Sequence, residues 1–178
     1  MPVLPDHLAP RLRVVFCGTA VGIASAARGH YYAGPGNEFW SALESAGLLP
    51  QGLGPTPDHR ILEFGIGLTD LAKNVAASSD RGLASSYDVE SFASKIQRFE
   101  PDWIAFHGKT AANQVARWRG EPMPVRLGRQ TWTVADSAVF VVPSMSGANR
   151  DPKRFEGKSS RQAWFAELAD LIGRANLS

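Results

Sequence analysis

The sequence predicts an α/β protein, a three-layer α/β/α sandwich with a mainly parallel central sheet. β-Branched apolar runs that end in glycine alternate with amphipathic segments of helical length. A parallel strand buried on both faces reads as a continuous apolar run, and a crossover helix connects it to the next strand. The chain has 178 residues, of which 44% are hydrophobic and 20% charged, which suits a single globular domain over residues 1–178.

In the first half of the chain, turn residues separate the expected elements. These elements are a strand over 12–18, a helix that starts at Asn37, a strand over 61–66, a helical turn over 68–73, and a Ser-, Ala- and Gly-rich connection over 76–86. Asparagine is a residue type that caps helices, and apolar residues follow Asn37 at helical spacing. Three prolines and two glycines between residues 48 and 57 indicate a loop before the next strand.

The second half of the chain continues the alternation. Its expected elements are a helix over 88–99, a strand over 103–108, a helix over 110–118, tightly joined strands over 130–135 and 138–142, and a helix over 159–172. Asp88 can cap the first of these helices. Pro101 cannot continue that helix, because proline has no N–H and restricts the residue before it.

Composition excludes several classes of protein. The single cysteine, Cys17, can form neither an internal disulfide nor a multi-cysteine metal site, and it favours a reducing compartment. No apolar run approaches the roughly 20 residues that span a bilayer, and the first residues lack the pattern of a signal peptide. The net charge of +2 is too small to indicate nucleic-acid binding without a local concentration of charge.

Ligands of such sheets bind beyond the carboxyl ends of the strands. The segments to search are therefore those after Cys17, His107 and Val142. In the first segment, Gly18 and Gly22 allow either a tight turn or the close approach of a ligand to the backbone. Beyond the last segment, residues 150–161 carry five Lys or Arg against two acidic residues, which fits either polyanion binding or a solvated charged face.

Six short motifs in a fixed order give the chain a family resemblance. They are Val14-Val15-Phe16-Cys17-Gly18 with Gly22-x-x-Ser25-Ala26, Pro35-x-Asn37-x-Phe39-Trp40, Gly67-x-Thr69-x-Leu71, Gly108-Lys109-x-Ala111, Gly128-x-Gln130-Thr131, and Ser146-Gly147-x-x-Arg150. With them the chain resembles the mismatch-specific uracil-DNA glycosylases, bacterial relatives of thymine-DNA glycosylase within the uracil-DNA glycosylase superfamily. Each motif is short, but together they extend over nearly the whole chain.

The resemblance implies a monofunctional enzyme of base excision repair. Such an enzyme rotates a damaged nucleotide out of DNA and hydrolyses its N-glycosidic bond without a cofactor or metal. We therefore expect DNA, double-stranded and also single-stranded, as the partner of this chain, with no membrane association. We further expect a monomer in the bacterial cytoplasm, associated with the nucleoid through DNA.

The resemblance also assigns residues. Tyr32 corresponds to the aromatic residue that stacks on the flipped base, Thr19 to a source of backbone donors at the edge of the base, and Ser25 to a wall of the base pocket. The resemblance assigns Gly147, Ala148, Asn149 and Arg150 to DNA binding. Lys109 opens a helix, where it could either hold a DNA phosphate or be solvated. Because Ala148 is smaller than the apolar wedge usual at its position, we expect a preference for loosened or single-stranded sites.

The sequence departs from the family at two pocket positions. Ala20 stands where the family has an asparagine that holds the attacking water, and Ser144 replaces another asparagine at the start of the second loop. A methyl group can neither orient water nor accept a proton. Either the chain has lost activity and only binds damaged DNA, or another group has taken over this role.

Asp70 is the strongest candidate for that group. Its position is often basic in relatives, and a carboxylate there could activate water and stabilise a cationic sugar. The alternative for Asp70 is a helix-start cap beside Thr69. His30 and His107 are weaker candidates, for which a surface loop and a packed strand end, respectively, are the simpler interpretations.

Overall fold

The structure is a computed structural model in which residues 1–175 are described, and within them one five-stranded sheet has the order β2-β1-β3-β5-β4. The strands are β1 (Val14–Val21), β2 (Ile66–Ala76), β3 (Trp103–His107), β4 (Gly128–Val134) and β5 (Ser137–Val142). β1 pairs in parallel with β2 and β3, and β3 pairs in parallel with β5. Only β4, at one edge of this sheet, is antiparallel to its neighbour. The predicted mainly parallel sheet is confirmed.

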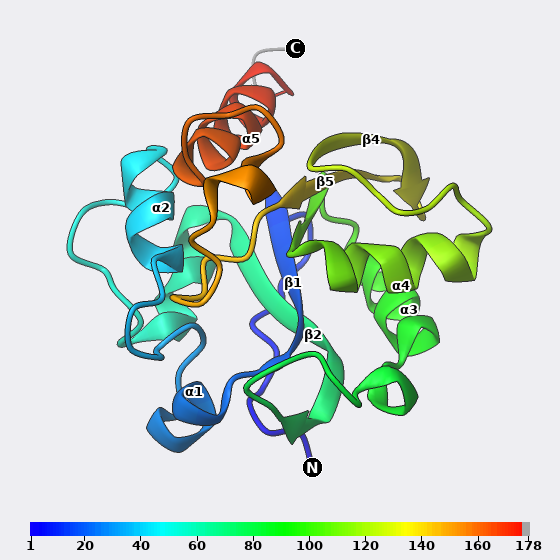
Figure 1. Ribbon diagram of the computed structural model, residues 1–178, viewed down its shortest axis with the longest axis horizontal. Helices are drawn as coiled ribbons and strands as arrows, with labels where there is room; N and C mark the ends of the chain where they lie inside the picture. Colours follow the sequence, from blue (N-terminus) through cyan, green and yellow to red (C-terminus); the bar gives the residue numbers. More distant parts are fainter. Residues whose placement is uncertain (176–178) are drawn as a thin grey trace.

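Helices cover both faces of the sheet. They are α1 (Ile23–Arg28), α2 (Phe39–Ser45), α3 (Val89–Phe99), α4 (Lys109–Arg119) and α5 (Gln162–Ala175), with short 3-10 helices η1 (Asp58–Phe64), η2 (Ala84–Ser86) and η3 (Pro152–Phe155). Figure 1 shows α1 and α2 on one side of the sheet and α3 and α4 on the other, while α5 packs beside α2. The three-layer prediction is therefore confirmed. Among residues 1–175, no helix has the length and apolar character needed to span a bilayer.

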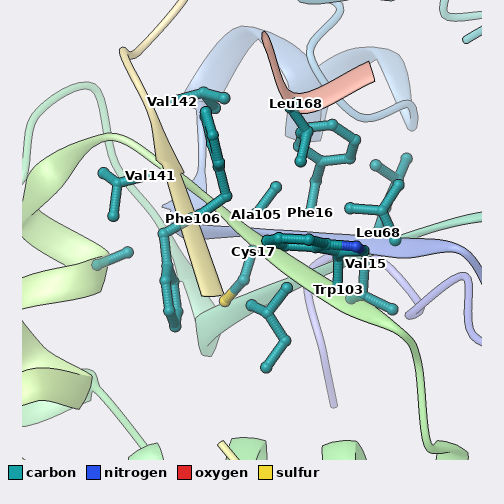
Figure 2. Packing of buried hydrophobic residues seen from close by; sticks show 14 of the residues in the cluster. Val15, Phe16, Cys17, Leu68, Trp103, Ala105, Phe106, Val141, Val142 and Leu168 are labelled. Atoms are coloured by element: carbon teal, nitrogen blue, oxygen red, sulfur yellow. The ribbon is translucent and has the colours of Figure 1, made fainter. Parts of the chain in front are cut away.

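Aromatic side chains fill the core on each face of the sheet. On one face the ring of Phe16 lies 5.1 Å from that of Phe39 in α2 and 6.1 Å from that of Phe165 in α5, measured between centroids. On the other face Phe106 in β3 lies 5.6 Å from Phe92 in α3. Figure 2 shows Phe16 and Phe106 pointing to different sides of the packed strands. These contacts fix both helical layers to the strands that carry the candidate site.

Asp88 caps α3 as predicted, whereas Asn37 stands one residue before Glu38, the N-cap of α2. Asp88 Oδ1 accepts a hydrogen bond of 2.9 Å from the backbone N–H of Ser91 at the start of α3. Asn37 Oδ1 accepts one of 2.9 Å from the N–H of Phe39, the first residue of α2. These side chains satisfy N–H groups that have no partner within the helix.

The prediction for residues 61–73 is wrong. The strand expected over 61–66 is the 3-10 helix η1, and the helical turn expected over 68–73 is part of the long strand β2. Residues 66–72 are all buried. A strand buried on both faces shows no polar alternation, so its pattern resembles that of a buried helix. Gly65, with φ of 73°, ends η1 and lets the chain enter β2.

The N-terminal segment pairs with the outer edge of β2. The backbone groups of His7 and Leu68 exchange hydrogen bonds of 3.0 and 2.9 Å, and the N–H of Val3 donates to the carbonyl of Lys73 at 2.7 Å. Between Ala72 and Ala76 the pairing of β2 with β1 shifts register. Such irregularities redirect side chains and are frequent beside functional sites.

Candidate active site

A cavity of about 1000 Å³ opens at the carboxyl ends of the parallel strands. Its walls come from residues 18–25, 77–80 and 107–110, from parts of 31–37 and 143–149, and from Asp70, Leu127, Lys153, Arg154 and Glu156. The six residues predicted for catalysis and base binding all line it: Thr19, Ala20, Ser25, Tyr32, Asp70 and Ser144. Lys109, Gly147, Ala148 and Asn149 line it as well, whereas Arg150 does not. The volume is large enough for a nucleobase and its sugar.

Asp70 reaches the cavity from the middle of β2. Its backbone pairs with Gly18 of β1, and a Cβ atom at Gly18 would lie only 2.8 Å from Asp70 Oδ1. The carboxylate therefore occupies space that the missing side chain of Gly18 leaves open. Because Asp70 lies within a strand, the alternative of a helix-start cap is wrong.

Asp70 is held in an environment that favours its neutral form. It is 4% exposed, and burial raises its pKa to about 7 against the lowering effect of Lys73, whose Nζ lies 4.0 Å from Oδ2. Oδ2 is buried and has no hydrogen-bond partner among residues 1–175. A carboxylate that changes charge near neutral pH is suited to accept a proton from water.

Tyr32 forms an aromatic wall beside Asp70. Its ring lies 3.9 Å from that of Phe39 and 4.7 Å from that of His107, measured between centroids. Its φ of 50° is in the left-handed region, an uncommon conformation for a tyrosine that places its side chain in the cavity wall. The hydroxyl is buried and has no hydrogen-bond partner within the described part of the chain, and burial raises its pKa, so it stays protonated.

The two candidate histidines have structural contacts. His107 Nε2 accepts a 2.9 Å hydrogen bond from the N–H of Met145, and burial lowers the His107 pKa to about 3, so the ring is neutral. His107 thus ties the end of β3 to the segment after β5. His30 lies outside the cavity wall, with Nδ1 at 3.4 Å from Asp58 Oδ1.

The remaining predicted pocket residues shape the backbone around the cavity. Ser25 Oγ accepts a 3.0 Å hydrogen bond from the N–H of Ala33 and so holds the loop that carries Tyr32. Ser144 Oγ accepts a weaker one, at 3.3 Å, from the N–H of Ser146. Ala20 offers only its methyl group and backbone to the cavity. Unlike these three residues, Asp70 presents a carboxylate to the cavity, and a carboxylate can accept a proton from water.

Thr19 has a contact that the sequence did not reveal. Its hydroxyl donates a 2.6 Å hydrogen bond to Asp80 Oδ1, across a sequence separation of 61 residues. The bond holds residues 77–80, which also line the cavity, against the end of β1. Asp80 lies in the Ser-, Ala- and Gly-rich connection predicted over 76–86, where no local pattern indicates a distant partner.

A buried arginine organises the loop over 143–150. The side chain of Arg161 is 3% exposed, and it donates hydrogen bonds to the carbonyls of Ser144 at 3.0 Å and Ser146 at 2.8 Å, and to the carboxylate of Glu38. Glu38 in turn donates its backbone N–H to the carbonyl of Met145. Sequence analysis did not identify Arg161, because it stands at the end of a run of exposed basic residues.

Arg150 lies on the same loop but faces solvent. Its side chain is 56% exposed, with Nη1 at 3.7 Å from Glu38 Oε1 and Nη2 donating to the carbonyl of Gly36 at 3.3 Å. Lys109, at the start of α4, lies 3.6 Å from Glu156 Oε2. Both cations are near the mouth of the cavity and carry only weak ion pairs, so a phosphate could recruit them.

Residues 1–175 contain no group of three or more His, Cys, Asp or Glu side chains arranged to hold a metal ion.

Comparisons with known proteins show the fold and the family of this chain. In structure, the chain is similar to a protein from Methanosarcina acetivorans that was solved by solution NMR and is proposed to be a uracil DNA glycosylase. The TM-score is 0.59 at 23% sequence identity, over 94% of this chain and 96% of the other, which shows a shared fold. Residues 5–169 match the family model of the uracil DNA glycosylase superfamily. Since this match extends over most of the sequence, the chain belongs to the uracil DNA glycosylase superfamily.

Proposed function

We propose that the protein is a monofunctional DNA repair glycosylase that flips uracil out of DNA and excises it, notably from G·U mismatches. Superfamily membership supports the removal of bases from DNA as the general role. Other deaminated bases and single-stranded sites fall within the proposed range, because Ala148 offers little bulk to replace a flipped base. A mispaired base also costs less to unstack than a paired one.

The proposed reaction is hydrolysis at C1′ of the deoxyribose. The C1′–N bond breaks, and its electron pair leaves with the base while positive charge develops on the sugar. Water then bonds to C1′ and gives a proton to Asp70, while the departing base anion takes a proton from solvent. Asp70 afterwards returns its proton to solvent, so that one water is consumed in all. Backbone N–H groups near Thr19 would stabilise the charge that gathers on the base carbonyls.

The single observation that carries this proposal is the position of Asp70. A buried carboxylate lies there in the wall of the cavity, near the hydroxyl of Tyr32 on the other side of Gly18. Ala20 stands where the family that the chain resembles has an asparagine that holds water. Without Asp70, this part of the cavity would therefore lack an acceptor for the water proton. Asp70 on β2 thus replaces the water-holding group that the family carries at the position of Ala20 on β1.

The test is strand cleavage after excision. The wild-type protein is incubated with an end-labelled duplex that contains one G·U pair, and alkali is added. Alkali breaks the strand at an abasic site, so a fragment cut at the uracil position is expected. Parallel duplexes with hypoxanthine and xanthine, and a single strand with uracil, measure the substrate range.

The alternative function is a protein that flips and binds damaged bases without cleaving them. Ala20 favours this alternative, because it removes the family's usual group for holding water. Intact strands with all of these substrates, together with tight binding to them, would support the alternative and contradict the proposed enzyme.

Arg150 gives a prediction for DNA binding. Replacing this exposed arginine by alanine should weaken duplex binding at every sequence and lower the slope of log affinity against log salt by about 1, as for one lost phosphate contact. Fluorescence anisotropy titrations at several salt concentrations measure both quantities. Arg60→Ala, which removes an exposed arginine paired with Glu63 on η1, is the control. An unchanged slope for Arg150→Ala would exclude it from the DNA interface.

A further inference from the structure

We propose that Lys73 and Asp6 together control the charge of Asp70. In this proposal Lys73 is a positioning residue that favours the ionised carboxylate, and Asp6 is a competing carboxylate that keeps Lys73 from pairing fully with Asp70. The inference rests on the proposed role of Asp70 as the proton acceptor, and it assigns a function to the N-terminal segment.

Lys73 is held between three oxygen-bearing side chains. Its Nζ lies 2.8 Å from Asp6 Oδ1, donates a 2.8 Å hydrogen bond to the Tyr31 hydroxyl, and lies 4.0 Å from Asp70 Oδ2. The side chain is 15% exposed. The ammonium therefore makes its direct contacts with Asp6 and Tyr31, and acts on Asp70 through charge across a gap too long for a hydrogen bond.

Asp6 is itself fixed by several contacts. Its Oδ2 lies 2.7 Å from Nζ of Lys95 in α3, and its Oδ1 accepts a 2.7 Å hydrogen bond from the hydroxyl of Thr69. Burial raises the Asp6 pKa, but hydrogen bonds from Lys73 and Lys95 outweigh this effect and hold it below its usual value. Asp6 is thus ionised and cannot easily release Lys73.

The backbone explains how Lys73 comes near Asp70. In a regular strand, residues three positions apart point to opposite faces of the sheet. Here β2 is an edge strand, and its register with β1 shifts between Ala72 and Ala76. The N-terminal segment holds this irregular part, because the N–H of Val3 donates to the carbonyl of Lys73. The segment therefore positions both the lysine backbone and its partner Asp6.

The charges around Asp70 balance only when Asp70 is ionised. The charged groups are the carboxylates of Asp6 and Asp70 and the ammonium groups of Lys73 and Lys95. The other titratable neighbours are Cys17, Tyr31 and Tyr32, and burial raises the pKa of each, so they remain uncharged. Loss of one cation from this group should therefore raise the pKa of Asp70, and loss of one anion should lower it.

The first experiment measures single-turnover excision from a G·U duplex as a function of pH. Ionised Asp70 is the active form, so the rate should fall as pH decreases through the Asp70 pKa. Lys73→Met should move this acid limb to higher pH, and Asp6→Asn should move it to lower pH, each by about one pH unit. On the acid limb, one unit is about tenfold in rate, so the two variants should differ about a hundredfold at low pH.

Matched variants separate charge from structure. Lys73→Arg keeps the positive charge and should return the acid limb toward its wild-type position. Arg60→Met and Glu63→Gln remove one charge of each sign from an exposed ion pair on η1, and neither should move the limb. Asp6→Asn preserves the shape of the side chain, so it carries the test alone if Lys73→Met does not fold.

A second readout does not depend on catalysis. The carbon-13 resonance of the Asp70 carboxyl group, followed against pH in the DNA-free protein, reports its ionisation directly. Opposite displacements in Lys73→Met and Asp6→Asn would support the inference even if no base were excised, in which case only the proposed function would fail. Excision with an Asp70 titration that neither variant moves would overturn the inference and leave the proposed function intact.

Discussion

Replacing Asp70 by asparagine is expected to reduce uracil excision by about 10²–10⁴-fold, the range typical of a lost general base. The amide has nearly the same shape as the carboxylate, but it cannot take a proton from water. Binding should persist, because Asp70 lies inside the cavity and the exposed cations at its mouth are unchanged. Single-turnover cleavage of a G·U duplex and anisotropy titrations measure the two properties separately.

The same substitution should also change how stability depends on pH, and this change reports the ionisation of the Asp70 carboxyl group. Burial raises the Asp70 pKa from 3.8 to about 7, so ionising this group in the folded protein costs stability. The cost is absent below about pH 4, grows as pH rises, and is complete above about pH 7. Asp70→Asn should therefore melt at a higher temperature than the wild type at pH 8, with little difference at pH 4.

An exposed aspartate provides the control. Asp102 precedes β3, at the opposite end of the strand from the cavity, and its substitution by asparagine should affect neither excision nor the pH dependence of melting. Normal excision by Asp70→Asn would assign water activation to a different group. It would leave the superfamily membership untouched.

Replacing Arg161 by methionine should destabilise the fold by about 1–3 kcal/mol, the usual range for hydrogen bonds lost by buried or charged groups, because Arg161 is buried while its partner Glu38 is 35% exposed. The carboxylate of Glu38 and the carbonyls of Ser144 and Ser146 would lose a common donor. For a chain of this size, each kcal/mol lowers Tm by about 2–4 °C, so a drop of roughly 2–12 °C is expected. Thermal unfolding by circular dichroism measures it.

Arg150→Ala is the matched control for this prediction, because both arginines contact Glu38 and only Arg161 is buried. An exposed ion pair contributes about 0–1 kcal/mol, so Arg150→Ala should melt close to the wild type while its DNA affinity falls. Arg161→Met should lower the melting temperature more than it lowers the DNA affinity. Equal melting temperatures for Arg161→Met and the wild type would show that the loop does not depend on this arginine.

The sequence was sufficient for the architecture and for much of the cavity wall. Continuous apolar runs ending in Gly18 and Gly108 predicted strands β1 and β3, and the segments after those strands do line the cavity. Asp88 and Asn37 predicted helix starts because capping depends on local hydrogen bonds. These features are encoded within a few residues of each other, so a single sequence can reveal them.

Features that depend on distant contacts could not be predicted in this way. The sequence predicts a helical turn for residues 68–73 of strand β2, because burial on both faces removes the polar alternation that distinguishes a strand. Arg161 and Lys73 carry no local sign of burial, since their partners Glu38 and Asp6 are far away in the sequence. Their importance becomes visible only when the sheet brings separate segments together.

The single cysteine can report whether the central strands of the sheet stay paired. Cys17 lies in β1, completely buried, directly before Gly18, and burial raises its thiol pKa. Alkylating and oxidising reagents attack the thiolate, so they can modify this side chain only during excursions in which the central strands separate. Protection of Cys17 from such reagents would thus monitor the integrity of the same two strands whose alignment sets Gly18 against Asp70.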